Sequence, residues 1–298
     1  MMKKRLCFIT LILIGLQQLF SENFSLNGKY YPDLYSTIDV LYIEDNTINY
    51  TFETKNETKS VKYSKNYDSG LLFFKLSEPF PKEISENYYY NGQNVETNDK
   101  ILILAGAKIN KEDRKRDRIL MFATTAGFDK DSYPFIWPMH SFEISPQYVD
   151  CTSYLLEKTK KYSIENLSNC MVDSPWVEGV DGDGIGEGFT MIDRLNRYYP
   201  YLLIMNGYIS YEKPYLYKQN NRIKKIKVTG LKSGKAKVLD VLDTPHPQTV
   251  DISFITEPEN IRVEIADVYK GTKYDDTCLH FCVTYNQEVI PYENSIKD

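Results

Sequence analysis

The chain has 298 residues, enough for two domains of ordinary size that each bury a core. Its 42% hydrophobic and 26% charged residues are typical of a globular protein, and its 25 Tyr and 14 Phe favour β-sheet. The formal net charge of −5 argues against nucleic acid and anionic lipid as partners, because a negative protein repels phosphate.

The first 21 residues have the layout of a secretory signal peptide. Lys3, Lys4 and Arg5 precede an apolar run over 6–16, which is too short to span a membrane, and a short stretch ending at Ser21 follows. We therefore expect a mature chain that begins near Glu22, is secreted or periplasmic, and inserts no segment into a membrane. Loss of the three basic residues, with no acid before Glu22, changes the formal charge from −5 to −8.

Residues 22–145 are predicted to form a small β-sheet or barrel domain whose role the sequence does not reveal. Polar turns separate its short apolar segments, and Glu-Asp-Asn between the first two is typical of a hairpin turn. The predicted strands are 36–42, 47–53, 60–63, 71–76, 100–105 and 119–124. Prolines at 134, 138 and 146 mark a connector, so we place the domain boundary near Ser145. Trp137 and His140 in this connector are expected to pack at the junction.

Residues 146–298 are predicted to form a β-sandwich. Short apolar runs alternate with turns that contain Asn-Gly, Ser-Gly or Pro. The runs are 201–205, 223–229, 236–242, 250–255, 261–268 and 279–285. The segment 151–161 reads as a short helix or an irregular arm.

The stretch Trp176-Val-Glu-Gly-Val-Asp-Gly-Asp-Gly-Ile-Gly-Glu187 is a shaped loop. Its glycines can adopt positive φ repeatedly, which excludes a regular helix. Measured as an EF-hand from Asp181, the loop lacks ligand oxygens at positions five and twelve. Calcium bound by Asp181, Asp183 and loop carbonyls in another geometry is kept as an alternative; otherwise no cofactor is expected.

Four cysteines remain in the mature chain, and an oxidising compartment would permit disulfides. Cys278 and Cys282 fall on one side of a predicted strand, about 13 Å apart, so they should not pair with each other. A bridge would have to reach Cys151 or Cys170. Cys278-Leu-His280-Phe-Cys282 is interpreted as a strand face rather than as a metal site, because tight turns that gather ligands are absent.

The sequence contains none of the common enzyme motifs compared with it. The glycine spacing does not fit a dinucleotide-binding loop, and neither Gly-x-Ser-x-Gly nor His-Glu-x-x-His occurs. Glu178 and Glu187 could flank a glycosidic bond as acid and base. Carboxylates in such a loop also accept backbone N–H groups, which is the favoured interpretation.

Together, several motifs resemble a known family. They are the glycine-rich stretch, Asn206-Gly-Tyr208, Asn221-Arg222, Asp243 with Gln248, and Tyr269-x-Gly-x-x-Tyr-Asp-Asp-Thr277. Over about 148–287 the chain resembles the NADase-type glycan-binding domain of bacterial secreted proteins, within the discoidin-like, galactose-binding-like group. The resemblance implies a jelly-roll sandwich whose loops at one end bind carbohydrate, and a closing strand after Thr277. It also favours a bridge from Cys151 or Cys170 to Cys278 or Cys282. It carries over no activity, because the chain has no room for a glycohydrolase domain.

Ligand-binding roles follow from that resemblance. Trp176, Tyr208, Tyr211 and Tyr215 would offer faces to a sugar ring, and hydrogen-bonding side chains would surround them. Those side chains are Glu178, Glu187, Asn206, Asn221 and Arg222. The same residues could instead build the fold, with Trp176 in the core, Asn206-Gly207 in a turn and Arg222 tying strands.

The sequence thus predicts an exported, non-catalytic protein that recognises glycan at a cell envelope or host surface. One alternative is a glycan-active hydrolase using Glu178 and Glu187. Another is an adhesion or scaffold module that binds a protein partner.

Overall fold

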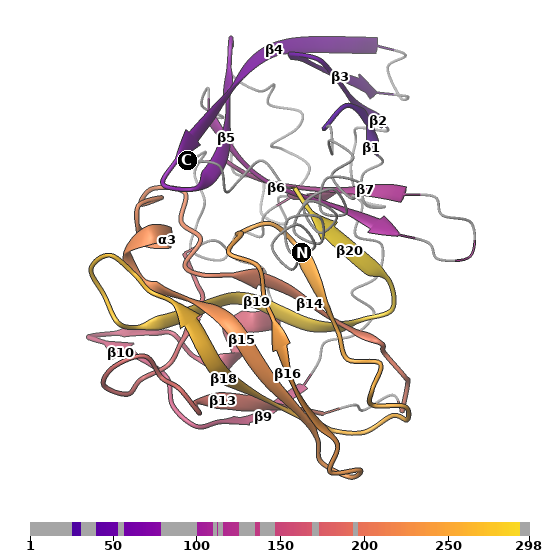
Figure 1. Cartoon of the computed structure of the whole chain (residues 1–298). Helices are drawn as coiled ribbons and strands as arrows, with labels where there is room; N and C mark the ends of the chain where they lie inside the picture. Colours follow the sequence, from indigo (N-terminus) through magenta and orange to yellow (C-terminus); the bar gives the residue numbers. More distant parts are fainter. Residues whose placement is uncertain are drawn as a thin grey trace, which may run out of the picture.

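The computed structural model describes residues 26–30, 40–52, 57–78, 100–109, 112, 116–124, 135–137, 147–168, 173–192 and 196–292. Strands dominate this part of the chain, which contains one short α-helix, α3 (Leu216–Gln219), and one 3-10 helix, η2 (Ile164–Ser168). The strands form two nine-stranded sheets and the small hairpin of β10 (Leu156–Glu157) and β11 (Lys160–Lys161) (Figure 1). The predicted all-β class is confirmed.

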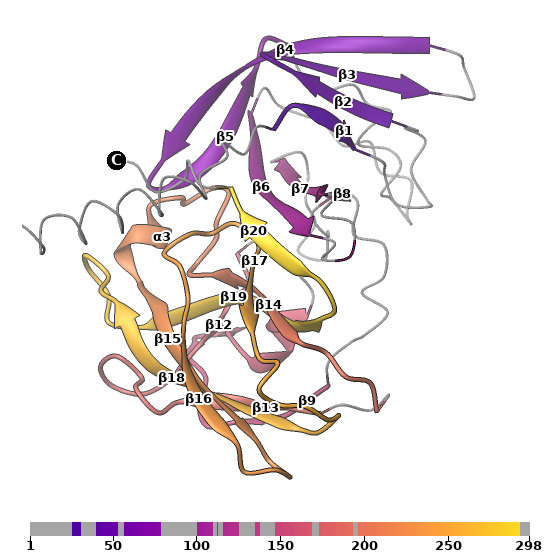
Figure 2. The same cartoon turned by 45° about the vertical axis from the view of Figure 1, so that its right-hand side comes forward.

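The first sheet is an antiparallel meander that curls on itself. Its strand order follows the chain from β1 to β8, and β1 comes to lie against β7. The strands are β1 (Gly28–Tyr30), β2 (Val40–Glu44), β3 (Thr47–Phe52), β4 (Glu57–Asp68), β5 (Leu71–Leu76), β6 (Lys100–Ile109), β7 (Arg116–Thr124) and β8 (Phe135–Trp137). The long β4 pairs with β3 through its first half and with β5 through its second, which bends the sheet around an apolar core (Figure 2). Asp45 has φ 50° in the predicted hairpin turn between β2 and β3.

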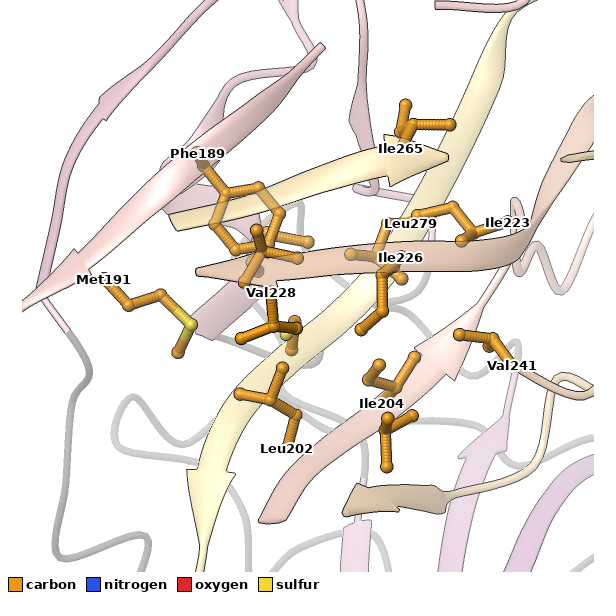
Figure 3. Close-up of a cluster of buried hydrophobic side chains, with 14 of the residues drawn as sticks. Phe189, Met191, Leu202, Ile204, Ile223, Ile226, Val228, Val241, Ile265 and Leu279 are labelled. Atoms are coloured by element: carbon orange, nitrogen blue, oxygen red, sulfur yellow. The ribbon is translucent and has the colours of Figure 1, made fainter. Parts of the chain in front are cut away.

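The second sheet folds over into a sandwich. Its order is β17-β14-β19-β15-β18-β13-β9, with β12 on β19 and β16 on β15. The strands are β9 (Gln147–Cys151), β12 (Trp176–Val177), β13 (Gly188–Ile192), β14 (Tyr201–Asn206), β15 (Asn221–Gly230), β16 (Ala236–Asp240), β17 (Gln248–Asp251), β18 (Ile261–Tyr269) and β19 (Thr277–Tyr285). Only two residue pairs join β15 to β19, in parallel, and beyond them the two layers separate around a core. Figure 3 shows Leu202 and Ile204 of one layer facing Ile226 and Val228 of the other.

A bulge in β19 changes which faces its residues occupy. Met205 pairs with Phe281 but Asn206 pairs with Leu279, so His280 is the extra residue. As a result Cys282 lies in the sandwich core, whereas Cys278 lies in a separate cluster with Tyr208. The expectation that the two cysteines share one side of the strand was therefore wrong, because a bulge shifts the alternation by one residue.

Of the described cysteines, Cys151, Cys278 and Cys282 are all free thiols. Cys170 lies outside the described residues, so a bridge that involves it stays a prediction. Burial raises the pKa of the Cys278 and Cys282 thiols well above the usual range, which disfavours the reactive thiolate.

The two sheets share a third apolar cluster. All six residues of β14 are buried, because Leu202 and Ile204 face the sandwich core while Tyr201, Leu203 and Met205 face the first sheet. On the first sheet, β5 and β6 alternate in the same way, and Leu71, Phe73, Leu102 and Leu104 face the sandwich. A late strand, β20 (Glu288–Pro291), then pairs with β6 (Figure 2).

Several polar contacts also join the sheets. The His246 Nδ1 accepts a hydrogen bond of 2.9 Å from the Ala105 N–H, and the Tyr211 hydroxyl donates one of 2.8 Å to the Lys100 carbonyl. The predicted boundary near Ser145 and the signal peptide over 1–21 lie outside the described residues. No helix in the described part of the chain is long and apolar enough to cross a membrane.

Candidate functional site

One end of the sandwich gathers most of the loops that the sequence singled out. We call it the apex and define it by the segments 152–161, 178–187, 207–219 and 270–276. Strand registers bring these segments together, because β9, β14 and β18 end here and β13, β15 and β19 begin here. The hairpin of β10 and helix α3 both lie at this end, on the left in Figure 1.

The glycine-rich loop has the irregular backbone that its composition predicts. Gly182, Gly184 and Gly186 have φ of 93°, 64° and 90°. Gly188 is required for a different reason, lack of space: a Cβ added there would lie 2.0 Å from the Val263 carbonyl oxygen. Gly182 and Gly186 are therefore required for their backbone conformation alone, whereas at Gly184 and Gly188 an added Cβ would also clash with the Glu178 side chain or the Val263 carbonyl.

Glu178 holds this loop in place from the inside. Its side chain is fully buried; one carboxylate oxygen accepts the Thr277 N–H at 3.1 Å and the other accepts the Val180 N–H at 2.9 Å. Burial raises the pKa of Glu178, and the two N–H donors partly offset this effect. Glu187 accepts a hydrogen bond from the Ser153 hydroxyl, which itself accepts the Gly179 N–H. Both carboxylates therefore serve the loop, and Glu178 has no surface from which to reach a glycosidic bond.

We expect Glu178→Ala to lower the free energy of unfolding by about 2–4 kcal/mol, since the buried Thr277 N–H and the partly buried Val180 N–H lose their acceptor. Urea unfolding of the chain from residue 22 onward measures this. The matched control is Asp181→Ala, an exposed acid of the same loop, which should change the stability by less than about 0.5 kcal/mol. Equal effects of the two substitutions would contradict a loop-fixing role for Glu178.

Three of the four aromatic residues expected to face a sugar are buried instead. Trp176 has no exposed surface, packs edge-on against Phe189, and donates its Nε1–H to the Ser153 carbonyl at 3.1 Å. Tyr208 is 7% exposed and lies in a cluster with Tyr162. Tyr211 is also 7% exposed and packs against the first sheet. These rings build the fold, and Tyr215, 45% exposed, is the one of the four with an open face.

The polar residues of the motifs tie strands together. The Asn206 amide donates to the Ile223 carbonyl at 2.6 Å and accepts the Ile223 N–H at 3.0 Å. Arg222, 5% exposed, makes a two-pronged ion pair with Asp243, with nitrogen–oxygen distances of 2.8 and 3.0 Å. Burial alone would raise the pKa of Asp243, but the guanidinium lowers it. Asn206 and Arg222 thus have their hydrogen-bonding groups turned inward.

Asn221 and Lys270 both contact the carboxylate of Asp183, one of the two acids that the calcium alternative would use. The Asn221 amide donates to Asp183 Oδ1 at 3.0 Å, and the Lys270 ammonium forms an ion pair with the same oxygen. The described residues include no group of three His, Cys, Asp or Glu side chains that could hold a metal ion. At Asp183 the positive charge therefore comes from a side chain of the chain itself, while Asp181 stays exposed.

The exposed face of the apex is held rigidly by hydrogen bonds. The 270–276 loop wraps the end of α3: the Thr272 N–H donates to Lys218 O, and those of Lys273 and Tyr274 donate to Gln219 O, over 2.8–3.1 Å. The Asn221 side chain fixes the same loop through the Gly271 N–H at 2.7 Å and the Asp275 carbonyl at 2.7 Å.

This loop carries an aromatic and cationic group beside Tyr215. Lys273 Nζ lies 4.7 Å from the centre of the Tyr274 ring, and a hydrogen bond to Tyr274 raises the pKa of Lys273, with a smaller effect from Tyr215. Tyr154, 40% exposed, stands on the neighbouring arm. The sequence did not single out Tyr154 or Tyr274 as a candidate ligand-binding residue, although Tyr274 falls within the motif Tyr269-x-Gly-x-x-Tyr-Asp-Asp-Thr277.

Residues 141–283 match the model of a family described as the NAD glycohydrolase translocation F5/8 type C domain. No curated protein matches the chain. Among the solved structures that match is CpGH89CBM32-4, produced by Clostridium perfringens, in complex with GlcNAc-α-1,4-galactose. It is 14% identical, with a TM-score of 0.31, and the match covers 50% of this chain and 99% of that one. Residues 141–283 of this chain are thus a discoidin-like, F5/8 type C domain of the kind that the NAD glycohydrolase translocation model describes.

Proposed function

We propose that the protein is a non-catalytic carbohydrate-recognition protein and that its apex makes the contact. The observation that carries this proposal is the group of exposed Tyr215, exposed Lys273 and half-buried Tyr274, on two apex segments that backbone hydrogen bonds hold together. The discoidin-like character of 141–283 supports it. The buried motif residues then serve as the frame that positions this group.

The chemistry of the group suits a sugar. A tyrosine ring offers a flat apolar face to the C–H face of a pyranose, and the ammonium of Lys273 can donate to hydroxyl oxygens. Asp275, also exposed, can accept from hydroxyl groups. Because the loop is already ordered, binding would sacrifice little conformational entropy.

Replacement of either apex tyrosine, Tyr215 or Tyr274, should weaken binding. We expect Tyr215→Ala and Tyr274→Ala each to lower the affinity for the best glycan about tenfold, which corresponds to about 1.4 kcal/mol. A glycan array with the chain from residue 22 onward identifies the ligand, and calorimetric titration then measures the affinities. Tyr215→Phe should retain binding, since it keeps the ring face.

The control for surface effects is Val238→Ala, a residue of β16 that is 56% exposed and lies outside the apex. It should bind as the unchanged protein does. If no glycan binds, or if the tyrosine variants bind normally, the proposal fails. Recovery of one protein partner by affinity capture, lost in Tyr215→Ala, would favour the scaffold alternative instead.

We further propose that the protein is exported and acts at an envelope or host surface. The support is the arrangement of Lys3, Lys4 and Arg5 ahead of the apolar run. Expression of the full sequence in a bacterial host should yield an extracytoplasmic protein whose N-terminus, measured by mass spectrometry, lies near Glu22. An intact N-terminus on a cytoplasmic product would contradict export.

A further inference from the structure

Strand β16 (Ala236–Asp240) forms an open edge of the sandwich. It pairs with β15 on one side, and in the described part of the chain no strand pairs with its other side. The hairpin of β15 and β16 projects at the lower end of Figure 2, away from the apex. Four of the five residues of β16 are exposed, so this edge is open to solvent as well as unpaired.

The backbone groups on the open side can be identified from the hairpin bonds. The Gly230 N–H donates to the Lys235 carbonyl at 2.9 Å, so Lys235 directs its backbone groups at β15. Successive residues of an antiparallel strand alternate in direction, so residues 237 and 239 do the same. The residues between them point their N–H and C=O groups outward, where these groups can pair with a further strand. They are Ala236, Val238 and Asp240.

The lysine side chains near this edge leave it clear. The Lys235 ammonium donates to the Phe254 carbonyl and to the Thr256 hydroxyl, both at 3.2 Å. The Lys237 ammonium lies 5.2 Å from the centre of the Phe254 ring. Lysines that project along an edge strand commonly block its pairing, but these two reach instead to the turn that follows β17.

Three exposed apolar side chains lie along the same edge. Val238 is 56% exposed in the middle of β16, Leu231 is 52% exposed in the preceding turn, and Leu242 is 50% exposed just after the strand. A second, antiparallel copy of β16 centred on Val238 would bring the two Val238 side chains together. It would also place Leu242 of each copy beside the turn that carries Leu231 in the other. The edge is therefore complementary to itself.

The charges beside the edge are paired within the chain, which favours a self-complementary partner over an acidic peptide. Lys225 forms an ion pair with Asp240 at 3.3 Å, and Lys227 forms one with Glu264 at 3.1 Å. In the antiparallel arrangement centred on Val238, no like charges are opposed. The facing pairs are Ala236 with Asp240, Lys237 with Leu239, and Val238 with its own equivalent.

We infer that β16 pairs with β16 of a second copy of this chain, in an antiparallel register with Val238 at the two-fold axis. The Val238 N–H of each copy donates to the Val238 carbonyl of the other, and the two sandwiches share one continuous layer. Because β15 runs away from the apex and β16 runs back towards it, the two apices lie at opposite ends of the dimer. One dimer would then link two glycan-bearing surfaces, a consequence that rests on the proposed function.

Sedimentation equilibrium of the chain from residue 22 onward tests the pairing, over a concentration series that extends to the millimolar range. The unchanged protein should follow a monomer–dimer equilibrium. Val238→Pro should weaken the dimer about tenfold or more, because proline removes an N–H that points to the second copy and none that points to β15. Val238→Ile, the matched control, keeps this N–H and should dimerise as the unchanged protein does.

Two charged variants test the register and keep every backbone group. Val238→Lys and Val238→Asp each oppose like charges at the two-fold axis, so each alone should be monomeric. Their equimolar mixture should form a mixed dimer, since the introduced ammonium then faces the introduced carboxylate. Thermal melts establish that all variants fold.

A monomer at every concentration would overturn the inference, and so would a dimer that Val238→Pro and Val238→Lys leave unchanged. A mixture of the two charged variants that stays monomeric would overturn the register. No glycan is present in these measurements, so failure of the dimer and failure of the apex as a glycan-binding site are distinguishable.

Discussion

A fragment that begins at residue 146 should fail to form a stable monomer, although it contains almost the whole family-matched segment. Without the first sheet, the outward faces of β14 and β19 lose their cover, and Tyr201, Leu203, Met205, Phe281 and Val283 become exposed. Full burial of one such side chain is worth about 2 kcal/mol, so the loss is on the order of 10 kcal/mol, comparable to the whole stability of a typical domain. Size-exclusion chromatography and urea unfolding of the fragment measure the outcome.

The chain from residue 22 onward is the reference for this experiment, and it should elute as a single folded species. A second fragment with Leu203→Thr and Val283→Thr should be more soluble, because its outer face is less apolar. A fragment that is monomeric and unfolds at the same urea concentration as the reference would show that the shared cluster contributes little.

Acidification should destabilise the protein through His246. Complete burial lowers the pKa of His246 to about 3 in the folded state, against 6.5 for an unperturbed histidine. Between those two values the unfolded chain binds more protons than the folded chain does. The stability from this residue is therefore complete above pH 6.5 and falls by about 1.4 kcal/mol for each pH unit below it. In the neutral form, His246 Nδ1 accepts the hydrogen bond from the Ala105 N–H. Protonation of Nδ1 would replace this acceptor with a second donor, so the hydrogen bond would be lost.

Urea unfolding at pH 6.5 and pH 5 isolates this effect from most carboxylate titrations. The unchanged protein should lose about 2 kcal/mol more over this interval than His246→Asn does, since an amide oxygen can accept the same N–H but does not titrate. Parallel pH profiles of the two proteins would show that His246 is not the group responsible.

The sequence predicted the architecture well because architecture depends on local patterns. Alternation and turn residues located most strands of the sandwich, and the glycines at 182, 184 and 186 do adopt positive φ. It missed β9 and β13, since the first lies beside a proline-rich connector and the second follows directly on the glycine loop. The bulge at His280 could not be predicted either, because it depends on pairing with β14.

The roles of the motif residues were harder to predict, for a chemical reason. The amide of Asn206 and the guanidinium of Arg222 can bind a backbone carbonyl or a carboxylate of the protein as well as a sugar hydroxyl. Only burial distinguishes these uses, and burial depends on the tertiary structure. The same holds for Trp176, whose ring fits a core as readily as a ligand.

The position of β20 bears on the order in which the molecule can be completed. One edge of β6 pairs with β5 over residues 100–103 and with β20 over residues 106–109. A chain that is made from its N-terminus therefore leaves half of this edge open until residues 288–291 have emerged. The sheet that contains β6 is completed only by a strand near the end of the chain, so a truncation before residue 288 would leave residues 106–109 of β6 unpaired along this edge.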